Sequence, residues 1–283
     1  MVENRPWLAW FSHFVLILGV VIVAFPVWMT FVASTHDQAT MLRAPVPILP
    51  GTHLIENYRT VLTEGYNQGS GGIPITQTLL NSLVMALGVA LGKIAISILA
   101  SFAIVYFRFP LRMTCFWAIF VTLMLPVEVR IVPTYGVVAA LGMVDSYPGL
   151  IIPLIASATA TFLFRQFFLS VPDELAEAAR VDGAGPMRFF RDILLPMSRT
   201  SMAALFVIQF IYGWNQYLWP LLITTKQSFY TAVMTVSRQA TVVDTVPSWN
   251  LLMAMAMLTM LPPVLVVVIM QRQFVRGLVE TEK

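Results

Sequence analysis

Residues 170–200, SVPDELAEAARVDGAGPMRFFRDILLPMSRT, form a polar stretch between two strongly hydrophobic segments. Ser170 and Asp173 have the spacing of a capping box, and Pro172 is tolerated in a first helical turn. The stretch therefore predicts a short helix that begins there and ends near Arg180.

A sharp turn should follow this helix, because Gly183 and Gly185 allow the left-handed or extended backbone that such a turn needs. Pro186 suits the first turn of a second helix, which should end before Pro196. We therefore expect two short helices at an angle to one another.

The first of these helices carries a candidate docking face for another protein. Ala178 and Ala179 offer small side chains that a partner can approach closely, and the Glu177 carboxylate would be aimed at that partner. The alternative is an ordinary amphipathic loop that lies at a membrane surface.

The composition excludes a soluble domain. The chain is 58% hydrophobic and 11% charged, with a mean hydropathy of +0.79, which indicates an all-α polytopic membrane protein. Cys115 is the only cysteine, so an internal disulfide and a cysteine-based metal cluster are excluded. The three histidines are too scattered to predict a metal site, and we expect none.

Hydropathy predicts six membrane-spanning segments, each long enough to cross the hydrocarbon core. They cover residues 14–33, 78–106, 114–139, 149–168, 201–223 and 249–271. A signal peptide is the alternative for the first segment, but its apolar run exceeds the usual ~7–15 residues. Lysine and arginine are concentrated in the connections that share a side with the N-terminus. This bias predicts that both termini and the 170–200 loop are cytoplasmic, within one transmembrane domain that covers residues 1–283.

Gly88, Gly92 and Lys93 briefly resemble a phosphate-binding loop. The spacing is one residue short, the Ser or Thr after the lysine is missing, and the motif lies inside a predicted span. The two glycines instead predict close packing of two helices. The sequence has no other nucleotide-binding loop, so no cofactor is expected on this chain, and any ATP hydrolysis would belong to another chain.

The third predicted span carries charges at a depth where each costs about 2.5–3.5 kcal/mol to insert. Pro126 and Pro133 bracket Glu128 and Arg130, which predicts a kinked helix that faces a cavity. Lys93 and Glu128 are equally far from the turn between the second and third spans, so they could neutralise each other and leave Arg130 unpaired. Two alternatives stay open: Glu128 pairs with Arg130, or Lys93 extends towards the interface.

The fifth predicted span carries a polar and aromatic stripe on one side of the helix. Its members are Gln209, Tyr212, Asn215, Gln216 and Trp219. Such a stripe usually faces a partner helix or an aqueous path, because lipid would leave its amides unsatisfied. With Lys93, Glu128 and Arg130 it forms the predicted substrate path, although packing alone could explain Trp219.

Several motifs together resemble the membrane subunits of binding-protein-dependent ABC importers, and among them the MalG-type permeases of carbohydrate importers. The EAA loop of that family is matched by Glu177, Ala178, Ala179 and Gly183, followed by Pro196. Other matching stretches are Asn81-Ser82, Trp214-Asn215 and the tail 271–278. Within the family, LMLPVEVRIVP (123–133) and FIYGWNQYLWPLL (210–222) are similar to permeases that import sn-glycerol-3-phosphate.

The resemblance implies a type I importer fold in the bacterial inner membrane, with no catalytic residue on this chain. The implied partners are a homologous second permease, two ATPase subunits, a periplasmic substrate-binding protein and membrane lipid, and no nucleic acid. The loop around Glu177 would dock on one ATPase. The implied substrate is sn-glycerol-3-phosphate or its diesters, for which the Arg130 guanidinium is suited.

Two other functions stay open at this point. A neutral sugar is the alternative substrate, and most sugar permeases of the family have an uncharged residue at the position of Arg130. An intramembrane enzyme is a remote alternative, because the spans contain no recognisable catalytic motif.

Overall fold

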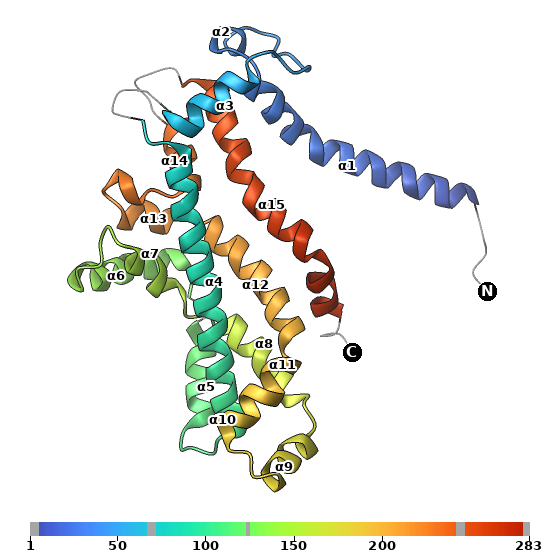
Figure 1. Ribbon diagram of the computed structural model, residues 1–283, viewed down its shortest axis with the longest axis vertical. Helices are drawn as coiled ribbons and strands as arrows, with labels where there is room; N and C mark the ends of the chain where they lie inside the picture. Colours follow the sequence, from blue (N-terminus) through green and yellow to red (C-terminus); the bar gives the residue numbers. More distant parts are fainter. Residues whose placement is uncertain (1–5, 67–71, 123–124, 242–246, 280–283) are drawn as a thin grey trace. The chain divides into compact units, whose positions relative to one another are not determined.

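The computed structural model describes residues 6–66, 72–122, 125–241 and 247–279 (Figure 1). These ranges contain helices, turns and irregular segments and no strand, which confirms the predicted all-α class. The chain divides into two compact units. Unit 1 is Met1–Gln77 with Val236–Met260, and unit 2 is Thr78–Thr235 with Leu261–Lys283.

Unit 1 contains the first apolar helix and the segments that follow it. Its elements are α1 (Pro6–Ser34), α2 (Gln38–Met41), α3 (Leu54–Thr63) and the first part of α15 (Trp249–Val279). Nearly all apolar side chains of α1 are exposed, as expected for a helix that faces lipid.

A buried amide pair organises unit 1. Asn57 donates from Nδ2 to the backbone carbonyls of Ser34 and His36, at 2.9 and 2.8 Å. Its Oδ1 accepts a hydrogen bond from Nδ2 of Asn250 at 2.9 Å. The Ser34 carbonyl at the end of α1 and the His36 carbonyl just beyond it are satisfied in this way.

Unit 2 contains most of the helices. They are α4 (Ile75–Tyr106), α5 (Arg112–Val121), α6 (Val127–Ala140), α7 (Tyr147–Ile151), α8 (Ala158–Leu169), α9 (Asp173–Val181), α10 (Pro186–Phe189), α11 (Leu195–Met197), α12 (Arg199–Trp214), α13 (Leu218–Ile223) and α14 (Ala232–Ala240). Three short turns join them: η2 (Ile152–Leu154), the π-helical η3 (Phe190–Leu194) and η4 (Gln227–Phe229). The helices α4, α14 and α15 cross the boundary between the units.

Helices α4 and α12 are packed antiparallel in unit 2. A Cβ atom on Gly213 would lie 3.0 Å from the Cα of Ala86, so the two backbones approach closely at that level. Further along α4, Lys93 reaches Gln209, which comes earlier in α12. Gly213 therefore brings the two helices close enough for this polar contact.

Gly88 and Gly92 have the packing role that their spacing predicts. A Cβ atom at Gly88 would lie 2.6 Å from the Ile151 side chain, and one at Gly92 would lie 2.5 Å from Ile155. Both glycines therefore admit the segment around α7 and η2 against α4. Because Gly92 and Lys93 are adjacent, the lysine projects from a different side of α4, towards α12.

The third predicted span, 114–139, is divided into the two shorter helices α5 and α6. Pro126 is the N-cap of α6, and Pro133 lies inside that helix. The interruption therefore comes before Pro126. Proline disfavours the helical conformation in the residue before it, which agrees with a helix that begins just after Pro126. The expected kink stays a prediction.

By length and apolar composition, three helices among the described residues can cross a membrane. They are Trp10–Ser34, Ile75–Tyr106 and Trp249–Arg272. Two bent helix pairs raise the number to at most five. The predicted segments 114–139, 149–168 and 201–223 are each interrupted, so hydropathy located apolar sequence there but not continuous helices.

Candidate functional site

The polar loop forms the two short helices that its sequence predicts. Helix α9 ends at Val181, the backbone turns at Gly183 with φ +71°, and α10 begins at Pro186 (Figure 1). Gly185 is extended, with φ −71° and ψ 167°. The predicted left-handed and extended glycines are therefore both present, and Gly183 is the one whose conformation favours glycine.

The predicted capping box is wrong. Ser170 is the C-cap of α8, and its hydroxyl donates to the carbonyl of Phe167 at 2.7 Å. Pro172 is the N-cap of α9, which has no side-chain cap. Ser170 therefore caps the C-terminus of α8 and not the N-terminus of α9. The local sequence is compatible with either role.

The second helix does not end before Pro196, as the sequence suggested. It continues from α10 through η3 into α11, which contains Pro196 and ends at Met197. The π-helical turn over Phe190–Leu194 has one more residue than an α-turn. This wider turn lets the helix pass the proline, whose ring would otherwise clash with the carbonyl four residues earlier.

Only part of the expected docking face is available to a partner. Glu177 and Ala178 are exposed, but Ala179 is 5% exposed and packs in an apolar cluster with Phe102 and Phe189. Ala179 therefore fixes α9 to the rest of unit 2 and does not face a partner. The outer face of α9 is completed by Val181, which is 87% exposed.

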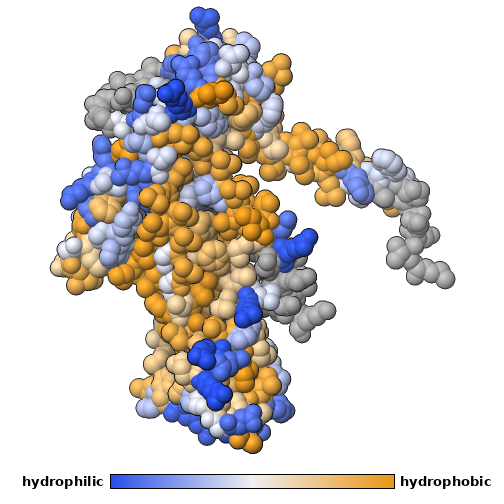
Figure 2. Space-filling model, viewed as in Figure 1, coloured by the Kyte–Doolittle hydropathy of each residue, from blue (hydrophilic) through white to orange (hydrophobic). Residues whose placement is uncertain are grey.

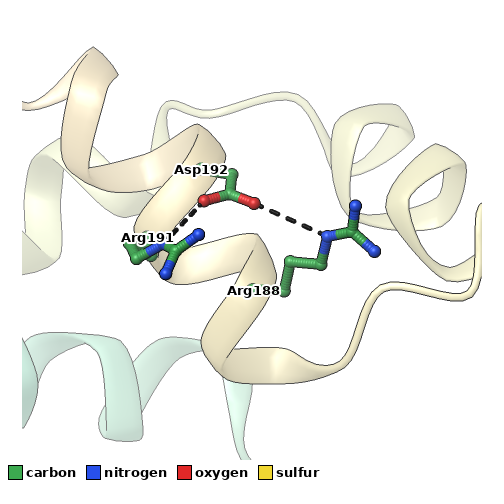
Figure 3. Close-up of polar contacts among 3 residues, drawn as sticks. All are labelled: Arg188, Arg191 and Asp192. Atoms are coloured by element: carbon green, nitrogen blue, oxygen red, sulfur yellow. Dashed lines mark hydrogen bonds and ion pairs between the residues drawn. The ribbon is translucent and has the colours of Figure 1, made fainter.

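The second helix of the loop presents charged side chains to solvent. Arg191 donates from Nε to Oδ1 of Asp192 at 2.9 Å, and Arg188 lies 3.6 Å from Oδ2 of the same carboxylate (Figure 3). Hydrophilic residues gather at this end of unit 2, beyond the apolar surface of the neighbouring helices (Figure 2). These charges exclude Pro186–Met197 from the hydrocarbon core, although this segment is apolar enough on average to pair with α12.

The most unusual charge inside unit 2 is the buried Lys93 of α4. Lys93 is 6% exposed, its Nζ donates to Oε1 of Gln209 at 3.0 Å, and the same atom lies 3.6 Å from the centroid of the Tyr212 ring. An amide oxygen and an aromatic face stabilise an ammonium, but neither neutralises it. The described partners of Lys93 therefore leave its positive charge without a counter-ion.

Arg130 is a second cation, on α6. Its neighbour Ile131 packs against the same apolar cluster as Tyr212, whose ring lies against the Lys93 ammonium. Among the described side chains, neither cation forms an ion pair. The expected partner Glu128 has a side chain outside the described residues, so the partner of Lys93 in the described part of the chain is Gln209.

The expected stripe on the fifth span is broken. Helix α12 ends at Trp214, Asn215 is its C-cap, and Trp219 belongs to α13. The cause is Pro220, which cannot donate to the carbonyl of Gln216, so the turn before the proline opens. Gln216 closes this end by donating from Nε2 to the carbonyl of Tyr212 at 3.1 Å.

Trp219 packs against α7, and its place on the substrate path stays a prediction. It is 3% exposed, and its indole Nε1 donates to the carbonyl of Gly149 at 3.1 Å. Asn215 is exposed and Gln216 is half-buried. Gln209, Tyr212, Asn215 and Gln216 therefore remain as the polar face at the end of α12.

Asn81 makes hydrogen bonds that join three segments of unit 2, a role that the sequence did not predict. Its Nδ2 donates to the carbonyls of Ser228 and Tyr230, at 2.8 and 2.9 Å, and its Oδ1 accepts from the hydroxyl of Tyr147. The adjacent Ser82 hydroxyl accepts from the backbone N–H of Ala232. The Asn81-Ser82 motif thus holds the segment after α13 against α4.

A second anchor joins the turn before α7 to the same segment. Desolvation raises the pKa of the Asp145 carboxyl. Hydrogen bonds from the backbone N–H groups of Thr225 and Lys226 and from the Thr225 hydroxyl together outweigh this effect, so the pKa is below its usual value. Asp145 has a positive φ of 53°, which this set of hydrogen bonds stabilises.

The chain is similar over its full length to proteins of known transport systems. The model of the family "Binding-protein-dependent transport system inner membrane component" matches residues 93–280. The sn-glycerol-3-phosphate transport system permease protein UgpE of Escherichia coli O157:H7 is 57% identical over 283 residues, 100% of both chains. The protein of the same name from E. coli strain K12 is 56% identical over the same length.

The fold is also that of a solved importer. A chain of a bacterial ABC transporter involved in the import of the acidic polysaccharide alginate superposes with a TM-score of 0.82 at 16% identity. The match covers 97% of this chain and 99% of the other. On this evidence the chain belongs to the family of inner-membrane components of binding-protein-dependent transport systems.

Proposed function

We propose that this chain is a permease subunit of an ATP-driven importer for sn-glycerol-3-phosphate or its diesters. The observation that carries the proposal is the buried Lys93 ammonium, whose described partners Gln209 and Tyr212 are neutral, and α6 supplies a second cation, Arg130. Ammonium and guanidinium groups bind phosphate oxygens through charge-assisted hydrogen bonds. The similarity to UgpE proteins along the whole chain supports the same substrate. A neutral sugar would leave both charges without a role.

In this proposal the substrate passes the end of α12. Gln209 and Tyr212 position the Lys93 ammonium, and Asn215 and Gln216 offer amides to the glycerol hydroxyls. Arg130 approaches from α6. Trp219 supports this arrangement through its packing against α7.

The loop formed by α9 and α10 docks on an ATPase in the cytoplasm. Glu177 and Ala178 contact that partner, while Ala179, Gly183 and Pro196 shape the loop from behind. Closure of the ATPase would push the two helices together as a lever, because Ala179 joins α9 to the apolar cluster around α4. The concentration of arginine on this side supports the cytoplasmic placement of the loop and of both termini.

The assembly follows from the family. A binding-protein-dependent system requires a substrate-binding protein and an ATPase. We propose that the complete importer contains this chain, a homologous second permease, two ATPase copies that hold ATP and magnesium, and a periplasmic binding protein.

Uptake by the reconstituted importer tests the substrate assignment. Arg130→Gln should reduce uptake of sn-glycerol-3-phosphate roughly ten- to a hundredfold, because one charge-assisted contact is lost. Basal ATPase activity and co-purification of all subunits should not change. Arg130→Lys should restore uptake in part, since an ammonium cannot provide a bidentate contact.

The double variant with Glu128→Gln separates this proposal from a structural role. If Arg130 serves only to neutralise Glu128, then Arg130→Gln should destabilise the complex, and the double variant should recover both assembly and uptake. Such a recovery would refute recognition of the phosphate by Arg130. Equal uptake of a neutral sugar by the wild-type importer would refute the substrate assignment itself.

A further inference from the structure

A pocket at the end of α4 takes no part in the proposed substrate path or in the outer docking face of α9. It has a volume of about 280 Å³ and lies between the last turn of α4 and the α9–α10 loop. Phe102, Phe107 and Phe189 form its apolar walls, and Arg108 and Arg180 line it from the two sides. The pocket therefore combines an apolar interior with two cationic side chains.

The two arginines are available to an external anion. Both are exposed, and among the described residues neither forms a hydrogen bond or an ion pair with another side chain. One carboxylate, Asp173, acts electrostatically on Tyr106, which also lines the pocket. The two guanidinium groups can offer charge-assisted hydrogen bonds to an anion at the pocket.

The position of the pocket along α4 is that of a membrane–water boundary. The helix is apolar for most of its length and ends at Tyr106, and Phe107 and Arg108 follow it. Aromatic side chains followed by arginine are typical of the headgroup region. The charged helix α9 lies directly beyond this turn (Figures 1 and 2).

An exposed apolar strip of α4 leads to the pocket. Ile96 and Leu99 on α4, and Phe107 just beyond its end, are 45%, 48% and 40% exposed. From Ile96 to Phe107 the strip extends roughly 16 Å at ~1.5 Å per residue, which is about half the thickness of a hydrocarbon core. An acyl chain of one membrane leaflet has this length.

We propose that the pocket binds the phosphodiester headgroup of an anionic phospholipid. Arg108 and Arg180 donate to the phosphate oxygens, the glycerol backbone contacts the phenylalanine walls, and an acyl chain lies along the strip that ends at Phe107. Because the walls belong to α4, α9 and α10, the bound lipid joins the membrane helix to the loop. Lipid composition would then control how firmly the loop is held, independently of the transported substrate.

Lipid binding to the purified, assembled importer tests this proposal. The probe is fluorescent phosphatidylglycerol, bound to the complex in nanodiscs of phosphatidylethanolamine, with retained lipid also identified by native mass spectrometry. Arg108→Gln and Arg180→Gln should each weaken binding roughly tenfold or more, as expected for a lost charge-assisted contact. The Lys variants should retain much of the binding, which also shows that the loop still folds.

Arg191→Gln is the matched control, because Arg191 is exposed on the same loop, pairs with Asp192 and does not line the pocket (Figure 3). An equal loss with this control would show unspecific attraction to a basic surface and would overturn the proposal. Displacement of the lipid by inorganic phosphate would indicate a site for a free anion. Lipid binding that appears only after removal of the ATPase would indicate an acidic ATPase side chain as the true occupant, and this result would overturn the proposal as well.

Discussion

At the scale of single residues, Lys93 is the group whose role decides between structure and transport. Gln209→Leu should leave the buried ammonium without its oxygen acceptor and lower the stability of the complex by about 1–3 kcal/mol. Lys93→Met together with Gln209→Leu should recover most of this loss, because both partners are then apolar. Thermal unfolding of the four complexes, including Lys93→Met alone, measures this coupling.

Uptake should respond differently from stability in the same set. The stable double variant should transport sn-glycerol-3-phosphate at least tenfold more slowly, because the positive charge is gone. Normal uptake by the double variant would mean that Lys93 only fills space. The contact between Lys93 and Gln209 joins residues 116 positions apart, which explains why reasoning about one helical hairpin did not find it.

Glu177 offers a second test at this scale. Glu177→Lys reverses one exposed charge and should weaken docking of the ATPase without changing the fold of the membrane helices. The measurement is co-purification of the ATPase, followed by uptake. Normal assembly and uptake with Glu177→Lys would contradict the docking face.

At the scale of elements, the turn between α9 and α10 depends on one backbone conformation. A Cβ atom at Gly183 or Gly185 would meet no atom within 4 Å, so neither glycine is required by steric contact with neighbouring residues. Only Gly183 has a positive φ, of +71°. Gly183→Ala should therefore cost about 1–2 kcal/mol and reduce coupling between ATPase activity and uptake, whereas Gly185→Ala should be tolerated. Equal effects of the two substitutions would refute this account.

The same loop shows how far local sequence predicts an element. The turn at Gly183 was predictable because positive φ is a property of a single residue. The predicted end of the second helix before Pro196 was wrong, because the helix continues past this proline through a π-helical turn. The buried face of Ala179 was also missed, since it depends on contacts with α4 that no short segment contains.

At the scale of the whole molecule, the distribution of arginine and lysine predicts the orientation in the membrane. After replacement of the exposed Cys115 by serine, a cysteine at Val181 should be protected from a membrane-impermeant thiol reagent added outside spheroplasts. A cysteine at Lys226 should react. Labelling of the Val181 position in intact spheroplasts would reverse the proposed topology.

Hydropathy identified the family architecture but not the continuity of its helices. Apolar composition is an average over many residues, while each interruption covers only a few residues, before Pro126 and between Trp214 and Leu218. The family match and the structural match do not depend on these details. Function was thus easier to predict than the geometry of the path.

The interruption between α12 and α13 should affect the rate of backbone amide hydrogen exchange. Backbone N–H groups in the continuous helix α4 exchange with deuterium only when several turns open together. At residues 215–217 the helix is already interrupted, and Pro220 prevents its repair. Amides of this short segment should therefore exchange much faster than those around Ala86 and Ala90, as hydrogen–deuterium exchange mass spectrometry would measure. The polar end of α12 would then be the part of the membrane region that is quickest to rearrange, and equal protection in both places would contradict this.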